Sequence, residues 1–146
     1  DSRDDIEHNS EKLLDLLLTD ILSREEFQSY TYKYQYSLRD LIPDNEDLTE
    51  DELRYARNEN THIDFLLYSK ISKKPILAIE VDGYEFHKEG TKQRERDKLK
   101  NSIFEKIGLP YLRLGTQESG EEERIISALN EIQTDYDASK YRKIKI

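Results

Sequence analysis

Two apolar segments separated by six mostly polar residues do most to limit what this chain can fold into. His62–Tyr68 and Pro75–Asp82 are rich in isoleucine, leucine and valine. Segments of this length and composition predict β-strands, and the short connection favours an antiparallel hairpin. If the hairpin turns symmetrically about Ser72, facing residue numbers add up to 144, which places Asp64 opposite Glu80.

The next two segments predict a strand that runs parallel to the end of the hairpin. Thr91–Ile107 is typical of a helix with one apolar face, and Gly108 is a suitable C-terminal cap. The apolar positions are Leu99, Ile103, Phe104 and Ile107. Pro110–Leu114 follows as a short strand. A helix between two strands of one sheet should cross over right-handedly and leave the strands parallel.

Further elements are predicted on either side of this unit. Ser10–Leu22 has apolar residues at helical spacing behind Ser10, which is a suitable N-cap, and Glu121–Ile132 has the spacing of an amphipathic helix. Tyr30–Leu38 alternates tyrosine with polar residues, which predicts a strand with one tyrosine face. That face either packs in the core, the interpretation we favour, or stacks exposed bases.

The order of these elements predicts a single α/β domain over residues 10–133, with a mixed four-stranded sheet flanked by helices. Residues 1–9 are expected to form a polar arm. Residues 134–146 are expected to form a basic tail, with positive charges at Lys140, Arg142, Lys143 and Lys145.

Pro43–Asn60 is acidic and poor in apolar residues, so it is expected to be an insertion. Thr49 and Glu52 have the spacing of a capping box, which predicts a short helix that continues to about Arg57. With so few apolar side chains to anchor it, the insertion is expected to be a mobile lid.

Charge and composition narrow the classes of protein that remain. The net charge is −9, but residues 61–115 hold eleven Lys or Arg against eight Asp or Glu, so this stretch is the one suited to face phosphate. No segment approaches the roughly 18 apolar residues of a membrane span. The chain has no cysteine, which suits a reducing compartment, and we expect a cytoplasmic protein. Because it also lacks methionine, we expect a domain of a longer protein.

The predicted hairpin brings acidic side chains together. Asp64 and Glu80 face each other, and Asp82 projects on the same side as Glu80. Opposed carboxylates repel, which is a poor way to stabilise a sheet, whereas a divalent cation between them would remove the repulsion. The alternative is structural: Asp82 and Gly83 are a strong turn signal, and Asp64 then marks the solvated end of a strand.

These acids belong to a longer pattern that resembles a known family. Asp64 on one strand, Glu80, Val81 and Asp82 at the end of the next, and then a helix and a strand resemble the PD-(D/E)XK superfamily of restriction-endonuclease-like nucleases. The fuller string resembles its small branch related to very-short-patch repair endonucleases, which is often appended to helicases. That string adds Gly83, His87, Arg96 to Lys100, Gly108 to Pro110, Leu112 and Arg113. The resemblance extends from about Ser10 to Leu114.

The resemblance implies an αβββαβ core and Mg²⁺- or Mn²⁺-dependent hydrolysis of DNA phosphodiester bonds, as in an endonuclease of DNA repair or defence. Asp64 and Glu80 would be metal ligands, with the Val81 carbonyl as a third, and Glu11 on the first helix would be an auxiliary acid. The superfamily usually has lysine two residues after the glutamate, where this chain has Asp82. That departure implies either a dead nuclease or a substitute for the lysine.

Several residues could fill the role of the missing lysine. His87 could act as an acid or base near neutral pH, and Lys88, Lys92 or Lys100 could supply positive charge. Lys92, Arg96 and Lys100 recur every four residues, which predicts a cationic stripe on the helix face opposite Leu99 and Ile103. Such a stripe, together with Lys88 and Arg113, would contact the phosphate backbone of DNA. The alternative is an ordinary solvated helix face, since Glu95 and Asp97 lie among these cations.

The sequence therefore predicts a metal-dependent deoxyribonuclease domain whose partners are DNA and a helicase or other domain of the same longer chain, with no membrane partner. Two alternatives remain open. One is a catalytically inactive module of the same fold that binds nucleic acid or docks another protein. The other is an acidic interaction domain that avoids nucleic acid.

Overall fold

The computed structural model describes residues 2–44, 47–82, 92–115, 120–135 and 138–146. Their elements in chain order are α1 (Ser2–Leu22), η1 (Glu25–Phe27), β1 (Tyr30–Ser37), η2 (Leu38–Asp40), α2 (Glu50–Arg57), β2 (His62–Ser69), β3 (Pro75–Asp82), α3 (Lys92–Ile107), β4 (Tyr111–Gly115), α4 (Glu121–Asp135) and η3 (Ala138–Lys140), where η marks a 3₁₀-helix.

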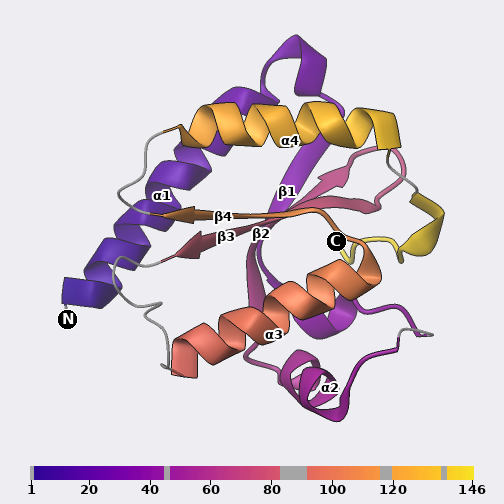
Figure 1. Cartoon of the computed structure of the whole chain (residues 1–146). Coiled ribbons are helices and arrows are strands. Elements are labelled where there is room, and N and C mark those ends of the chain that lie inside the picture. The colour runs from indigo at the N-terminus through magenta and orange to yellow at the C-terminus, as the bar shows by residue number, and fades with distance from the viewer. Residues whose placement is uncertain (1, 45–46, 83–91, 116–119, 136–137) are drawn as a thin grey trace.

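The strands form one mixed sheet in the order β1-β2-β3-β4. The first two pairings are antiparallel and the pairing of β3 with β4 is parallel. Helices α1 and α4 cover one face of the sheet, and α2 and α3 lie against the other (Figure 1). The predicted α/β class, the mixed four-stranded sheet and the flanking helices are therefore confirmed.

The hairpin has the register that a symmetric turn predicts. Phe65 pairs with Ile79, and Leu67 with Leu77, so their numbers add up to the expected sum. A register irregularity between Leu67 and Tyr68 lies close to the turn. The regular pairing extends from Leu67 and Leu77 to Phe65 and Ile79, and Asp64 and Glu80 are the next residues of the two strands.

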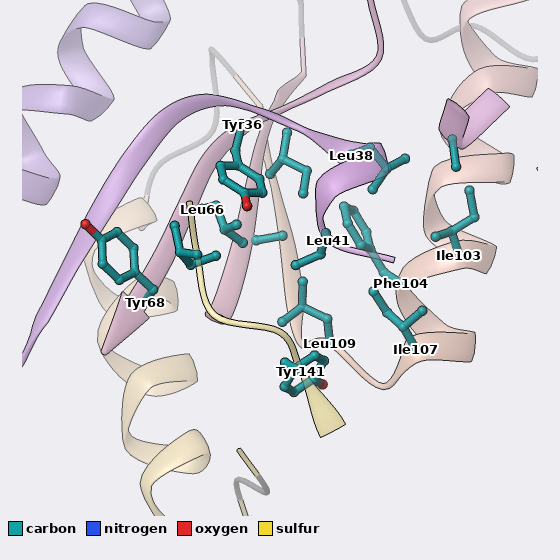
Figure 2. Packing of buried hydrophobic residues seen from close by; sticks show 14 of the residues in the cluster. Tyr36, Leu38, Leu41, Leu66, Tyr68, Ile103, Phe104, Ile107, Leu109 and Tyr141 are labelled. Carbon is teal, nitrogen blue, oxygen red and sulfur yellow. The ribbon is translucent and has the colours of Figure 1, made fainter. Parts of the chain in front are cut away.

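Each face of the sheet buries its own apolar cluster. The α1 and α4 side contains, among others, Leu18, Ile21, Phe65, Ile79, Ile125 and Leu129. The opposite cluster, shown in Figure 2, contains Leu38, Leu66, Ile103, Phe104 and Tyr141. Because both faces are covered, side chains of β2 and β3 are buried whichever way they point, which explains the nearly continuous apolar runs in these strands.

The N-terminal helix is longer than expected. Helix α1 begins at Ser2, so the expected start at Ser10 and the expected arm over residues 1–9 are wrong for the described residues 2–9. No glycine or proline interrupts Ser2–Leu22, and a helix already stabilised by packing extends at little cost through such a segment.

The tyrosines of β1 do not share one face. Tyr36 is buried with the α3-side cluster, as core packing predicts, whereas Tyr32 is half-buried against the α1-side cluster. The break lies at Gln35, whose φ of 53° is in the left-handed region. This conformation interrupts the alternation of a regular strand, and Tyr34 is left 51% exposed.

The acidic insertion is anchored, contrary to the argument that it lacks apolar contacts. The capping box at Thr49 and Glu52 is confirmed, and helix α2 ends at Arg57 as expected. Leu48 and Ala56 are buried. Glu52 is buried too, where it accepts hydrogen bonds from Ser102 and Lys106 of α3. The reason given for a mobile lid is therefore wrong.

The C-terminal segment is part of the core rather than a free tail. Tyr141 and Ile144 are buried in the α3-side cluster, and Figure 2 shows Tyr141 within it. The Ile144 N–H donates to the Lys73 carbonyl at 2.6 Å, and Arg142 pairs with Asp44. Two of its positive side chains, Arg142 and Lys145, thus form ion pairs within the domain.

Glu52 makes the fold sensitive to acid. Burial would raise the pKa of its carboxyl, but hydrogen bonds from Lys106, Ser102 and Thr49 outweigh burial and lower the pKa from 4.5 to about 2. A depressed pKa stabilises the fold above pH 4.5, and this contribution is lost as the pH falls toward 2. We expect Glu52→Gln to lower the free energy of unfolding by about 1–2 kcal/mol at neutral pH, a value reduced because solvent partly screens the Lys106 ion pair. In strong acid the variant and wild type should be equally stable.

Urea unfolding of wild type and Glu52→Gln at several pH values measures this difference. Glu50→Gln, an exposed change on the same helix, is the control and should have little effect. A gap between wild type and Glu52→Gln that stays constant from neutral pH into acid would contradict the assigned role.

Candidate active site

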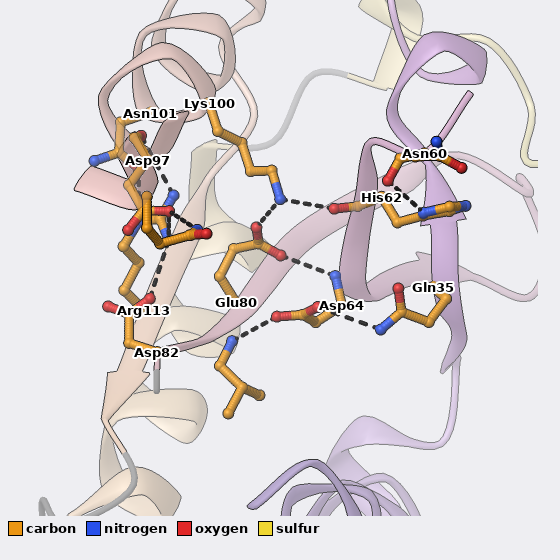
Figure 3. A network of polar contacts seen from close by, with 12 residues as sticks. Gln35, Asn60, His62, Asp64, Glu80, Asp82, Asp97, Lys100, Asn101 and Arg113 are labelled. Atoms are coloured by element: carbon orange, nitrogen blue, oxygen red, sulfur yellow. Dashed lines mark hydrogen bonds and ion pairs between the residues drawn. The ribbon is translucent and has the colours of Figure 1, made fainter. Parts of the chain in front are cut away.

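Two carboxylates lie between the ends of β2 and β3. The Asp64 N–H donates to Glu80 Oε2 at 2.8 Å, and the Val81 N–H donates to Asp64 Oδ2 at 2.8 Å (Figure 3). Each carboxylate thus accepts a hydrogen bond from a backbone N–H of the other strand. The acids are held by the sheet itself, at the carboxyl end of β3.

A lysine reaches this pair from α3. Lys100 Nζ forms an ion pair with Glu80 Oε1 and donates to the His62 carbonyl at 2.7 Å (Figure 3). Lys100 is 9% exposed and Glu80 is 3% exposed, so the pair is shielded from water. Burial alone would lower the pKa of Lys100, but the charge and hydrogen bond of Glu80, together with nearby Tyr55 and Asp64, jointly outweigh burial and raise the pKa, so the ammonium stays charged.

The position of Lys100 corrects the predicted helix faces. The buried face of α3 consists of Lys100, Ile103, Phe104 and Ile107. Leu99 lies at its margin and is only half-buried. Lys92 and Arg96 are exposed, so Lys100 does not continue them as a solvent-facing cationic stripe. The lysine is buried because its ammonium has an acceptor on β3, which helical periodicity cannot show.

A second set of charges lies beside the first, between β3, β4 and α3. Arg113 pairs with Glu80 in the parallel register, and its guanidinium contacts Asp82 at 3.1 Å and Asp97 at 3.4 Å. Its Nε donates to Asn101 at 2.7 Å. Asp82 therefore faces a cation of β4.

The predicted auxiliary acid also reaches the site. Gln35 Nε2 donates to Asp64 Oδ1 at 3.3 Å and to Glu11 Oε1 at 3.4 Å. Because one amide nitrogen contacts both acids, Glu11 of α1 and Asp64 of β2 are neighbours. The Tyr34 hydroxyl donates to the other Glu11 oxygen at 2.6 Å.

The charged form of Asp64 is strongly disfavoured in the folded protein. Burial and the nearby charge of Glu80 raise the pKa of Asp64 from 3.8 to about 7, and the hydrogen bond from Val81 and the charge of Lys100 offset only part of this. A buried carboxylate that is difficult to ionise is a position where an added cation is favourable.

These groups surround a cavity of about 190 Å³. It is lined by Glu11, Asp64, Glu80, Val81, Asp82, Gln93, Asp97, Lys100 and Arg113. The cavity opens between α1, α3 and the carboxyl ends of β3 and β4, whose arrowheads point to the N-terminal half of α1 in Figure 1. Of the site residues predicted from sequence, the structure thus brings together Glu11, Asp64, Glu80, Val81, Asp82, Lys100 and Arg113.

The donor set fits a hydrated divalent cation better than a closed metal cage. Within the described residues, no group of three or more His, Cys, Asp or Glu side chains is arranged to hold a metal ion. Mg²⁺, however, prefers one or two carboxylates and completes its shell with water and substrate phosphate. Asp64 and one neighbouring acid, Glu80 or Glu11, supply the two carboxylates that Mg²⁺ needs. A cation there would also provide the positive charge that ionised Asp64 lacks.

Some predicted residues lie elsewhere and some site residues were missed. His87 and Lys88 fall outside the described residues. Gln35, Asp97 and Asn101 were not predicted. Asp97 and Lys100 share a polar helix face with Gln93, and this interruption of the apolar face was a usable signal. Gln35 is one polar residue among others in an alternating strand, and nothing in the sequence marks it.

The fold and the cavity define an α/β domain with carboxylates and a buried lysine at the carboxyl end of β3. Residues 35–132, more than half of the chain, match the family described as Protein of unknown function (DUF2726), and the chain belongs to this family. Comparison with curated proteins and with solved structures finds no match. The matched residues contain Asp64, Glu80 and Lys100, whereas Glu11 precedes them.

In the described part of the chain, no helix has both the length and the apolar character needed to cross a bilayer.

Proposed function

We propose that this domain is a Mg²⁺- or Mn²⁺-dependent deoxyribonuclease, resembling the PD-(D/E)XK superfamily in the use of its acids. The observation that carries the proposal is the contact of Lys100 with Glu80 beside Asp64. The resemblance requires two acids and a lysine, and the lysine was missing from position 82. A lysine from α3 supplies the same kind of charge to the same glutamate.

The chain's own groups have separable roles in hydrolysis. Asp64 and Glu80 would hold the cation, which supplies an activated water and stabilises charge on the phosphate. Lys100 would steady the attacking water and the negative charge that develops on the phosphate oxygens. Asp82 of β3 and Asp97 of α3 hold the guanidinium of Arg113, so it is ordered before substrate arrives.

DNA would approach over the exposed start of α3. Lys92 and Arg96 are solvent-exposed and lie one helical turn apart, ahead of the residues that line the cavity. Phosphate contacts of this kind position a duplex or single strand without reading its sequence. The proposal therefore places backbone binding beside the acids and assigns no base recognition to the described residues.

A catalytically inactive module is the second candidate, because the same contacts also form a satisfied internal network. Glu80 has Lys100 and the Asp64 N–H as partners, which is what a purely structural ion pair needs. In this case the domain would bind nucleic acid or dock against another part of a longer protein, such as a helicase.

Incubation with labelled single-stranded, duplex and branched DNA tests the proposal. We expect cleavage that requires Mg²⁺ or Mn²⁺ and stops with EDTA, with Glu80→Gln inactive on every substrate. Binding of DNA without cleavage in either metal would favour the inactive module. No binding at low salt would instead favour an acidic interaction domain.

A further inference from the structure

The most unusual backbone in the sheet lies next to the acids. Gln35 is a non-glycine residue in the left-handed region in the middle of β1, and it is missing from an otherwise continuous register with β2. Such a conformation costs on the order of 1–3 kcal/mol and persists only where other contacts enforce it. The contacts made by Tyr34 and Gln35 show what that conformation allows.

Tyr34 and Gln35 hold the same carboxylate. The Tyr34 hydroxyl donates to Glu11 Oε2, and Gln35 Nε2 donates to Glu11 Oε1. In a regular strand, consecutive side chains point to opposite faces and could not meet at one carboxylate. The positive φ at Gln35 breaks this alternation, so both side chains reach Glu11, and Gln35 also reaches Asp64 (Figure 3).

We propose that Tyr34 and Gln35 are positioning residues that clasp Glu11 of α1 beside Asp64, and so keep a second carboxylate next to Asp64 at the cation site while Glu80 is paired with Lys100. This inference rests on the proposed function. Glu11 precedes the residues matched by the family, whereas Gln35 and Asp64 lie within them, so these contacts join α1 to the matched part of the chain.

Glu11 would add a cation ligand because the carboxylates of the β2–β3 hairpin already have partners. Glu80 is already occupied by Lys100, and Asp64 Oδ2 by the Val81 N–H. The oxygens that face Gln35 are Asp64 Oδ1 and Glu11 Oε1. Removing the clasp would leave Glu11 free to turn toward solvent, and the cation would lose one of its carboxylates.

Calorimetric titration with Mn²⁺ measures how much Glu11 and the two residues that hold it contribute to cation affinity. We expect Glu11→Gln to weaken Mn²⁺ binding about 10-fold, and the pair Tyr34→Phe with Gln35→Gly to weaken it similarly, as loss of supporting contacts to metal ligands does. Adding Glu11→Gln to that pair should cause no further loss, because both changes remove the same carboxylate.

Lys73→Gly is the matched control for strain. Lys73 is the other described non-glycine residue with a positive φ, at 62°, and it lies in the hairpin turn away from the cavity. Glycine relieves the backbone strain at both positions, so Lys73→Gly should leave Mn²⁺ affinity unchanged. An equal loss of affinity in Lys73→Gly would overturn the proposal.

A second measurement needs no metal. In EDTA, the side-chain amide resonances of Gln35 should shift in Glu11→Gln and in Asp64→Asn, because the amide donates to both carboxylates. If Mn²⁺ binds wild type but the clasp variants bind it equally well, the clasp role is overturned and the proposed function stands. If wild type binds no Mn²⁺, the proposed function fails and the cation role of the clasp fails with it, whatever the amide resonances show.

Discussion

Asp64→Asn is expected to lower DNA cleavage at least 10³-fold, by an order-of-magnitude estimate, while the protein folds as wild type does. The change removes a charged metal ligand and nearly preserves its shape. A bound cation contributes several kcal/mol to stabilising the transition state, and each 1.36 kcal/mol is a factor of ten in rate. Cleavage of the substrate that wild type cuts best measures the loss.

The same variant should be more stable than wild type without metal. The pKa of Asp64 is raised from 3.8 to about 7 in the fold, so the folded state keeps a proton that the unfolded chain releases. Stability of wild type therefore falls as the pH rises from about 4 to about 7. Asp64→Asn removes this loss, which amounts to roughly 2–4 kcal/mol at 1.36 kcal/mol per pKa unit.

Thermal melts with EDTA and with Mn²⁺ separate the site from a purely structural role. Mn²⁺ should stabilise wild type according to its concentration and affinity, and should have far less effect on Asp64→Asn. Asp47→Asn, an exposed acid outside the cavity, is the control and should respond as wild type does. If Asp64→Asn and wild type gain equally from Mn²⁺, the proposed site is wrong.

Lys100→Met is expected to have the second large effect, on stability and cleavage together. Removing the lysine leaves Glu80 buried without its counter-charge, which costs about 3–5 kcal/mol in comparable buried pairs. Cleavage should fall at least about 100-fold, as it does when one group that stabilises transition-state charge is removed. Urea unfolding and cleavage rates measure the two losses.

The double variant Lys100→Met with Glu80→Gln distinguishes the two losses. It removes both charges, so most of the stability should return, whereas cleavage should be lost because Glu80→Gln is itself inactive. Lys98→Met changes an exposed lysine on the same helix and should alter neither quantity strongly. A Lys100→Met protein that cleaves DNA at the wild-type rate would show that the lysine has no part in hydrolysis.

The position of Asp64 beside Glu80 was predictable because the register of a hairpin depends on local rules. Strand alternation and a short symmetric turn fix which residues face each other, and the observed pairing of Phe65 with Ile79 has the predicted register. The parallel return of β4 was predictable for a similar reason, because the helix between the two strands leaves few ways to connect them.

What only the tertiary structure decided depends on contacts between distant elements. Helical periodicity predicts Leu99 on the buried face of α3, but the structure buries Lys100 there. The ammonium can be buried because Glu80 of β3 supplies a carboxylate to pair with it. The burial of Tyr141 depends in the same way on packing that no local pattern records. Gln35 is the clearest case: its left-handed backbone is tolerated because two side chains hold Glu11, and neither residue type nor spacing predicts that conformation.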